Sequence, residues 1–334
     1  MKENSFPQGE EGQCGGTGFE IWKPHVVSEF ILLGLSSDWD IQVSLFVLFL
    51  IMYLVTVLGN FLIVLLIRLD GRLHTPILHS PMYFFLSVLS LVDIYYTNST
   101  VPQMFIDFLS SWKSISFHGC VLQLYVSLAM GRTEFFLLGT IAYDCYVAVC
   151  HPLHYTLIMN GGLCLGLAAG CLVAGFMNSL MQTIIIFQLP LCHNIINYFA
   201  CEMLAVLRLA CADISFNMIM VAISGFLVIM PPCFLVLFSY ACVVPTILHI
   251  CFSQGCLKAF GICTSHLSVA SMCFGTAFSS YMRPVSGSST EQEKTVAFFY
   301  AIVTPILDPL IYSLRDKDVI GALQKVLGKF SQKG

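Results

Sequence analysis

The sequence predicts an all-α protein, a bundle of seven transmembrane helices followed by a short interfacial helix. Of its 334 residues, 57% are hydrophobic and only 10% are charged, and the mean hydropathy is +0.83. An average soluble domain carries about 25% charged residues, so this chain lacks the polar surface to stay dissolved in water. A net charge of -4 gives no basic surface for nucleic acid, and we expect no nucleic-acid partner.

Apolar runs long enough to cross a bilayer recur along the chain. A transmembrane helix needs about 20 predominantly apolar residues. The predicted spans cover residues 43–67, 82–109, 120–150, 163–188, 214–248, 259–281 and 295–314. Membrane lipid is therefore an expected partner.

Polar segments flank the spans and define three parts of the chain. Residues 1–40 are predicted to be an extracellular segment, 41–315 the seven-span domain, and 316–334 a cytoplasmic amphipathic helix and tail. In the tail, apolar residues recur at helical spacing with lysines elsewhere, which is typical of an interfacial helix. A slight excess of Lys and Arg on one side places the N-terminus outside. We therefore expect a multi-pass plasma-membrane protein.

The third span, 120–150, contains ionisable residues inside a long apolar run. Arg132, Glu134 and Asp144 all fall within it. A charged group at the centre of a span costs about 2.5–3.5 kcal/mol on insertion scales, so such residues are functional candidates by default. Asp144 and Tyr146, near the predicted cytoplasmic end, suggest a switch.

Several stretches, in order along nearly the whole chain, resemble the odorant (olfactory) receptors, a rhodopsin-like family of G-protein-coupled receptors. The stretches are GN at 59–60, LHTP at 73–76, PMYFFLSVLSLVDI at 81–94, AYDCYVAVCHPLHY at 142–155, SY at 239–240, KAFGICTSH at 258–266 and TPILDPLIYSLRDKDV at 304–319. The resemblance implies binding of a small-molecule odorant, activation of a stimulatory G protein that raises cyclic AMP, and no enzymatic activity.

The resemblance also implies sites. The ligand candidates, in the outer halves of spans three, five and six, are Ser127, Leu128, Gly131, Arg132, Ser224, Val228, Phe274, Ala277 and Tyr281. These are mostly small, apolar or aromatic side chains, which suits a volatile apolar ligand. The candidates for G-protein coupling and switching are Asp144, Cys145, Tyr146, Tyr240, Lys258, His266 and Tyr312.

Two further groups of residues are implied. Disulfides are expected between Cys120 and Cys201 and between Cys192 and Cys211. A second group consists of three carboxylates at similar membrane depth, Asp93, Glu134 and Asp308. They cannot all ionise without sharing a proton or a cation. No cofactor is expected beyond a possible structural sodium ion, and the alternative is a set of neutral hydrogen-bonded acids.

The chain departs from the family pattern where the switch is expected. The family triplet Asp-Arg-Tyr is Asp144-Cys145-Tyr146 here. The missing guanidinium, with its five rigid donors, would pair with the aspartate at rest and meet the G protein when active. Coupling is therefore expected to be impaired. Arg132 is a further departure, because an uncharged residue is usual at that position.

Other function classes remain as alternatives. A transporter or channel would also place carboxylates in a bundle, but it predicts inverted repeats, which the sequence lacks. A receptor-like chain that does not signal is a second alternative. The sequence holds no H-E-x-x-H or G-x-S-x-G motif, so an enzyme is disfavoured.

Overall fold

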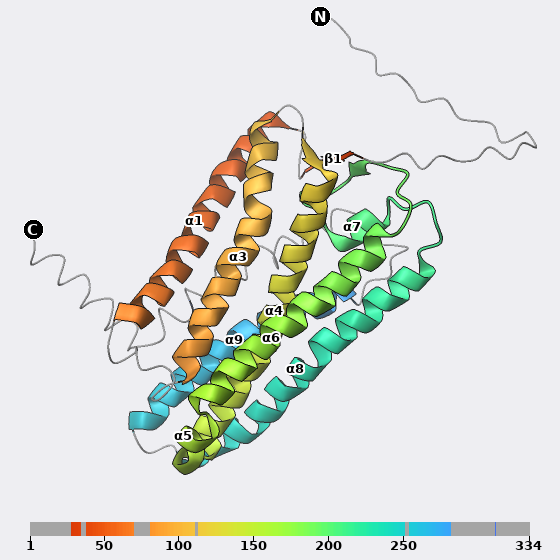
Figure 1. Cartoon of the computed structure of the whole chain (residues 1–334). Coiled ribbons are helices and arrows are strands. Elements are labelled where there is room, and N and C mark those ends of the chain that lie inside the picture. Colours follow the sequence, from red (N-terminus) through yellow and green to blue (C-terminus); the bar gives the residue numbers. More distant parts are fainter. Residues whose placement is uncertain are drawn as a thin grey trace, which may run out of the picture.

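The computed structural model describes residues 28–34, 38–69, 81–110, 113–250, 254–281 and 311. For residues 250, 254–262 and 280–281, the backbone alone is described. The segment 1–27, the tail 316–334 and the predicted seventh span, apart from residue 311, lie outside the described residues. Figure 1 shows the described part as long helices arranged side by side, with β1 and α7 near one end and α5 at the other.

Six of the predicted spans lie in long helices whose ends fall within a few residues of the prediction. They are α1 (Trp39–Leu69), α3 (Pro81–Leu109), α4 (Phe117–Cys150), α6 (Gly161–Phe187), α8 (Ser215–Ile250) and α9 (Gln254–Tyr281). Within the described residues, α1, α4, α6 and α8 are long and apolar enough to cross a membrane. Helices α3 and α9 have 29 and 28 residues, and their sequences carry more polar side chains.

Helix α4 is the central helix of the bundle. In its most apolar window 67% of the residues are buried, against 28% in α1 and α6. It packs against α3, α6, α8 and α9. Glycines allow two of these approaches: a Cβ at Gly175 of α6 would lie 2.8 Å from the Ala129 carbonyl oxygen, and one at Gly139 would lie 3.0 Å from Pro232 Cβ of α8.

A small sheet covers one end of the bundle, which we call the disulfide end. Its strands are β1 (Glu29–Leu32), β2 (Ser114–Ser116) and β3 (Ile195–Ile196), in the order β2-β1-β3. Strand β1 is antiparallel to β2 and parallel to β3. Phe30 and Leu32 of β1 are buried. The short apolar run that begins at residue 29 therefore belongs to this sheet.

Short elements and caps fix the helix ends. Ser116 caps α4 by accepting a hydrogen bond from the Gly119 N–H at 3.1 Å, and Asn160 caps α6 through the Leu163 N–H at 2.9 Å. Such caps satisfy backbone donors that a helix leaves unpaired. Between α4 and α6 lie a 3-10 turn, η1 (Pro152–His154), and α5 (Tyr155–Ile158), at what we call the switch end.

Candidate functional site

Two disulfides hold the long loop between α6 and α8: one ties it to α4 and the other closes the loop on itself. Cys120 is bonded to Cys201, with Cα atoms 5.5 Å apart, and Cys192 to Cys211, with Cα atoms 5.7 Å apart. These are the two pairs that the resemblance implies. Closing a loop with a sequence separation of 81 stabilises the folded state by roughly 4.5 kcal/mol in the chain-entropy model.

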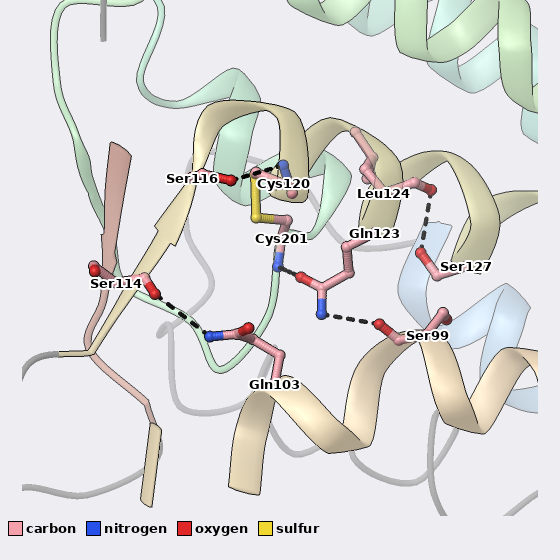
Figure 2. Close-up of a disulfide and its surroundings, with 10 residues drawn as sticks. Ser99, Gln103, Ser114, Ser116, Cys120, Gln123, Leu124, Ser127 and Cys201 are labelled. Atoms are coloured by element: carbon pink, nitrogen blue, oxygen red, sulfur yellow. Dashed lines mark hydrogen bonds between the residues drawn. A yellow bond between two sulfur atoms is a disulfide. The ribbon is translucent and has the colours of Figure 1, made fainter. Parts of the chain in front are cut away.

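A buried glutamine, which the sequence analysis did not single out, adds a second tie beside the first disulfide (Figure 2). Gln123 Nε2 donates to the Ser99 carbonyl oxygen of α3 at 3.1 Å. Its Oε1 accepts from the Cys201 N–H at 2.9 Å. Gln123 therefore joins α3, α4 and the loop through one side chain. The sequence offered only a polar residue almost one turn after Cys120.

The predicted ligand residues lie on α4, α8 and α9 in the half of the bundle nearer the disulfide end. Ser127 and Leu128 are half-buried; Gly131 and Arg132 are buried. Arg132 precedes Gly139 by seven residues and so lies on nearly the same face of α4, the face that meets α8 at Pro232.

On the other two helices the predicted ligand residues are also buried. Ser224 of α8 donates to Asn178 Oδ1 of α6 at 2.9 Å, and Val228 is buried one turn further along α8. Phe274 of α9 packs on Phe135 of α4, with ring centroids 5.4 Å apart.

Ala277 is buried as well, and the side chain of Tyr281 lies outside the described residues. A hollow of about 340 Å³ lies elsewhere, in the outer loop near His193 and Arg208, where the sequence analysis predicted no site.

Two of the three predicted carboxylates are described, and both are buried. Asp93 of α3 is 1% exposed and Glu134 of α4 is 2% exposed. Glu134 Oε1 accepts a hydrogen bond from the Cys273 thiol of α9 at 3.2 Å. Asp308 lies outside the described residues, and within the described ones no three His, Cys, Asp or Glu side chains group as metal ligands. The two described carboxylates nevertheless offer oxygen ligands, which hard cations prefer.

At the switch end, Asp144 has a hydrogen-bond partner other than the absent arginine. Its carboxylate, on a residue 1% exposed, accepts from Tyr155 Oη at 2.9 Å. Burial, and then the nearby Asp144 charge, raise the pKa of Tyr155 above its usual value. The phenol therefore stays protonated and remains a donor. Tyr155 is a site residue that the sequence analysis missed, although it ends the matching stretch 142–155.

Two of the other switch candidates, Tyr240 of α8 and His266 of α9, lie together inside the bundle, and Cys145 of α4 is buried as well, at 5% exposed. Tyr240 Oη donates to the Cys263 carbonyl oxygen at 3.0 Å and lies 2.9 Å from His266 Nδ1.

Tyr146 points elsewhere: its Oη lies 3.2 Å from His151 Nε2, and its ring packs on Phe238 of α8. The side chain of Lys258 and the whole of Tyr312 lie outside the described residues.

A transmembrane helix bundle with a disulfide-tied loop at one end and a buried polar cluster at the other is the architecture of a seven-helix receptor. The family model described as olfactory receptor matches residues 49–330. The chain is 55% identical to the olfactory receptor-like protein OLF3 of Canis lupus familiaris and 56% identical to human olfactory receptor 2F1, in each case over 95% of this chain and 97% of the relative. Human olfactory receptor 2K2 is 44% identical over the same shares.

The chain belongs to the olfactory receptor family. It is a G-protein-coupled receptor for odorants, a multi-pass plasma-membrane protein with a seven-helix bundle, and not an enzyme. The disulfide end is accordingly the extracellular end of the bundle, and the switch end is cytoplasmic. Family membership disfavours the transporter or channel that the buried carboxylates left open.

Proposed function

We propose that this receptor binds small, mostly apolar odorants among α4, α8 and α9 in the outer half of the bundle, and that binding opens the cytoplasmic end to a stimulatory G protein. One observation carries the proposal: the central helix α4 bears ligand candidates such as Gly131 in its outer half and Asp144 at its cytoplasmic end. A shift of this buried helix against its neighbours couples the two ends. Cyclic AMP is the readout.

The chemistry of the ligand candidates supports a weakly bound apolar ligand. Val228, Phe274 and Ala277 offer apolar surface, while Ser127 and Ser224 offer hydroxyl groups. Burying apolar area gains about 25 cal/mol per Å², so a ligand of roughly ten heavy atoms gains only a few kcal/mol. Dissociation constants between about 1 μM and 1 mM correspond to about 8 to 4 kcal/mol. We expect responses in that range.

The ligand position is tested with a matched pair of phenylalanines one turn apart on α9. Phe274 is 6% exposed and faces α4, whereas Phe278 is 36% exposed. Phe274→Leu should shift the odorant concentration for half-maximal cyclic AMP, and Phe278→Leu should not, at equal surface expression. A mixed odorant panel supplies the first agonist. Equal responses of both variants would contradict the proposed position.

We propose further that Cys145 weakens coupling, because a thiol cannot replace a guanidinium at the G-protein contact. Cys145→Arg should then raise basal or odorant-driven cyclic AMP. Cys150→Arg, on the same helix near its cytoplasmic end, controls for added positive charge. No rise with Cys145→Arg would show that this position does not limit coupling.

The second candidate is a receptor-like chain that does not signal. It is favoured by the cysteine at position 145, where the family has arginine. It predicts surface arrival with silence in both the unchanged chain and the Cys145→Arg variant. A cyclic AMP response from the unchanged chain excludes it.

A sodium ion within the bundle is also proposed. Asp93 and Glu134, with Asp308, would hold it through carboxylate oxygens. The ion would supply the positive charge that allows buried carboxylates to stay ionised. The burial of both described carboxylates supports this proposal.

A further inference from the structure

A hollow of about 340 Å³ lies in the long extracellular loop between α6 and α8. Ligand pockets span about 300–1,000 Å³, so this volume suits a small molecule. One wall comes from the segment 192–197, which contains β3, and the other from α7 (Met203–Leu207) and the turn that follows it (Figure 1). None of the described lining residues belongs to α4, α8 or α9. The hollow is therefore separate from the odorant position proposed above.

Covalent and hydrogen bonds hold both walls of the hollow in place. The disulfide between Cys192 and Cys211 joins them, and the Cys192 N–H donates to the Leu209 carbonyl oxygen at 3.0 Å. The Ile31 N–H of β1 donates to the Asn194 carbonyl oxygen at 2.7 Å, where β3 pairs with β1. A site whose walls are already ordered loses little conformational entropy when a ligand binds.

The hollow is lined by an arginine and a histidine and by no acid. These two residues are Arg208 and His193, and no aspartate or glutamate is among the lining residues that the structure describes. The whole chain has the opposite balance, with 19 acidic residues against 15 lysines and arginines. A concave surface that carries one sign of charge attracts ligands of the other sign. The lining therefore favours an anion.

The two acids nearest to these walls in the sequence bind groups of their own segments. Glu202 Oε2 accepts from the N–H groups of Leu204 and Ala205 at 2.9 and 3.2 Å, which caps α7. Asp213 Oδ1 accepts from the Ser215 N–H at 2.9 Å and from the Ser215 hydroxyl at 2.6 Å. Neither acid lines the hollow, so neither takes the place of an anionic ligand.

The lining combines hydrogen-bond donors with apolar surface. A guanidinium such as that of Arg208 can bind a carboxylate through two parallel N–H groups, and Asn194 and Asn197 carry amide donors. Leu209 is buried and Ala205 is half-buried, and both belong to the lining. Inorganic phosphate would use the donors alone. An organic acid with a small apolar body would use both kinds of surface.

We propose that this hollow binds a small organic acid in its carboxylate form, with Arg208 holding the carboxylate and Ala205 and Leu209 contacting the apolar body. His193 and Arg208 are exposed, so the ligand reaches the hollow from the extracellular fluid without entering the bundle. The inference adds a second ligand class to the apolar odorants proposed for the bundle. Its test needs no signalling readout, so it can fail or succeed independently of the proposed function.

The test uses the purified full-length receptor in detergent and two probes of matched shape, 4-fluorobenzoate and 4-fluorobenzyl alcohol, whose fluorine resonances broaden on binding. The benzoate should bind at micromolar to millimolar concentrations. The alcohol should bind about tenfold more weakly or worse, because it lacks the charge-assisted hydrogen bonds. Inorganic phosphate at the same concentration should not displace the benzoate. Absent benzoate binding, equal binding of the alcohol, or displacement by phosphate would overturn the proposal.

Variants locate the bound probe. Arg208→Gln should raise the dissociation constant of 4-fluorobenzoate about tenfold or more. Lys113→Gln removes one positive charge beside β2, outside the hollow, and should leave the constant unchanged. Ala205→Phe places a large side chain in the hollow and should abolish binding. Unchanged affinity in Arg208→Gln, or an equal loss in Lys113→Gln, would refute the site even if Ala205→Phe fails to fold, which size-exclusion chromatography shows.

Discussion

Replacing Gly175 of α6 with alanine should push two central helices apart. A Cβ at this position would overlap Thr133 Oγ1 and would lie 2.8 Å from the Ala129 carbonyl oxygen and 3.1 Å from the Thr133 amide nitrogen. A side-chain hydroxyl can rotate away, but the two backbone atoms of α4 can move only with the helix. The methyl group must therefore displace α4 from α6.

The magnitude follows from comparison with Gly170→Ala on the same helix. A Cβ at Gly170 meets no atom within 4 Å. Both substitutions gain the helix preference of alanine over glycine, about 0.5–1 kcal/mol, and this gain cancels in the difference between them. The remaining difference is the cost of overpacking, typically about 1–3 kcal/mol.

The assay is thermal unfolding of the detergent-solubilised receptor, followed by loss of the monodisperse peak in size-exclusion chromatography. The midpoint shifts by about 2–4 °C per kcal/mol for chains of 150–250 residues and by less for larger ones, so Gly175→Ala should unfold a few degrees below Gly170→Ala. Equal midpoints for the two variants would refute the close approach of α4 and α6. Gly166→Ala, which is also unobstructed, should behave like Gly170→Ala.

Three further outcomes are expected. Gln123→Ala leaves the buried Cys201 N–H without its acceptor, so the free energy of unfolding should fall by about 1–3 kcal/mol; an unchanged midpoint would show that this tie is dispensable. Tyr155→Phe removes the hydrogen bond to Asp144, and a loss of about 1.5–3 kcal/mol is expected for a bond to a charged group; unchanged thermal stability would contradict it. If sodium binds the buried acids, exchange of sodium for choline should lower the unfolding midpoint of the unchanged chain, and Glu134→Gln should remove that difference. A variant that keeps the dependence would place the ion elsewhere.

Much of the fold could be predicted because a bilayer imposes it on the sequence. A backbone in hydrocarbon must satisfy its hydrogen bonds internally, so each long apolar run becomes a helix. The six described spans therefore appeared within a few residues of their predicted ends. Strand β1 could not be predicted in this way, because it forms only by pairing with β2 and β3, which lie far along the chain.

The ties between helices were decided by the tertiary structure. Nothing in the sequence around Gln123 indicates that its amide would reach Ser99 on one helix and Cys201 in a distant loop. The sequence likewise did not indicate which residue would donate a hydrogen bond to Asp144. The sequence showed the loss of an arginine, and the packing of α5 supplied Tyr155 in its place.

The sequence by itself determined that this chain is a membrane helix bundle of the olfactory receptor family, because periodic apolar runs and local motifs are properties of contiguous residues. It also marked Cys145 as a departure from that family. Only the tertiary structure decided that Tyr240 of α8 meets His266 of α9, with Oη 2.9 Å from Nδ1. Which side chains meet across a bundle depends on helix rotation and depth, and these are set by the packing of all the helices together.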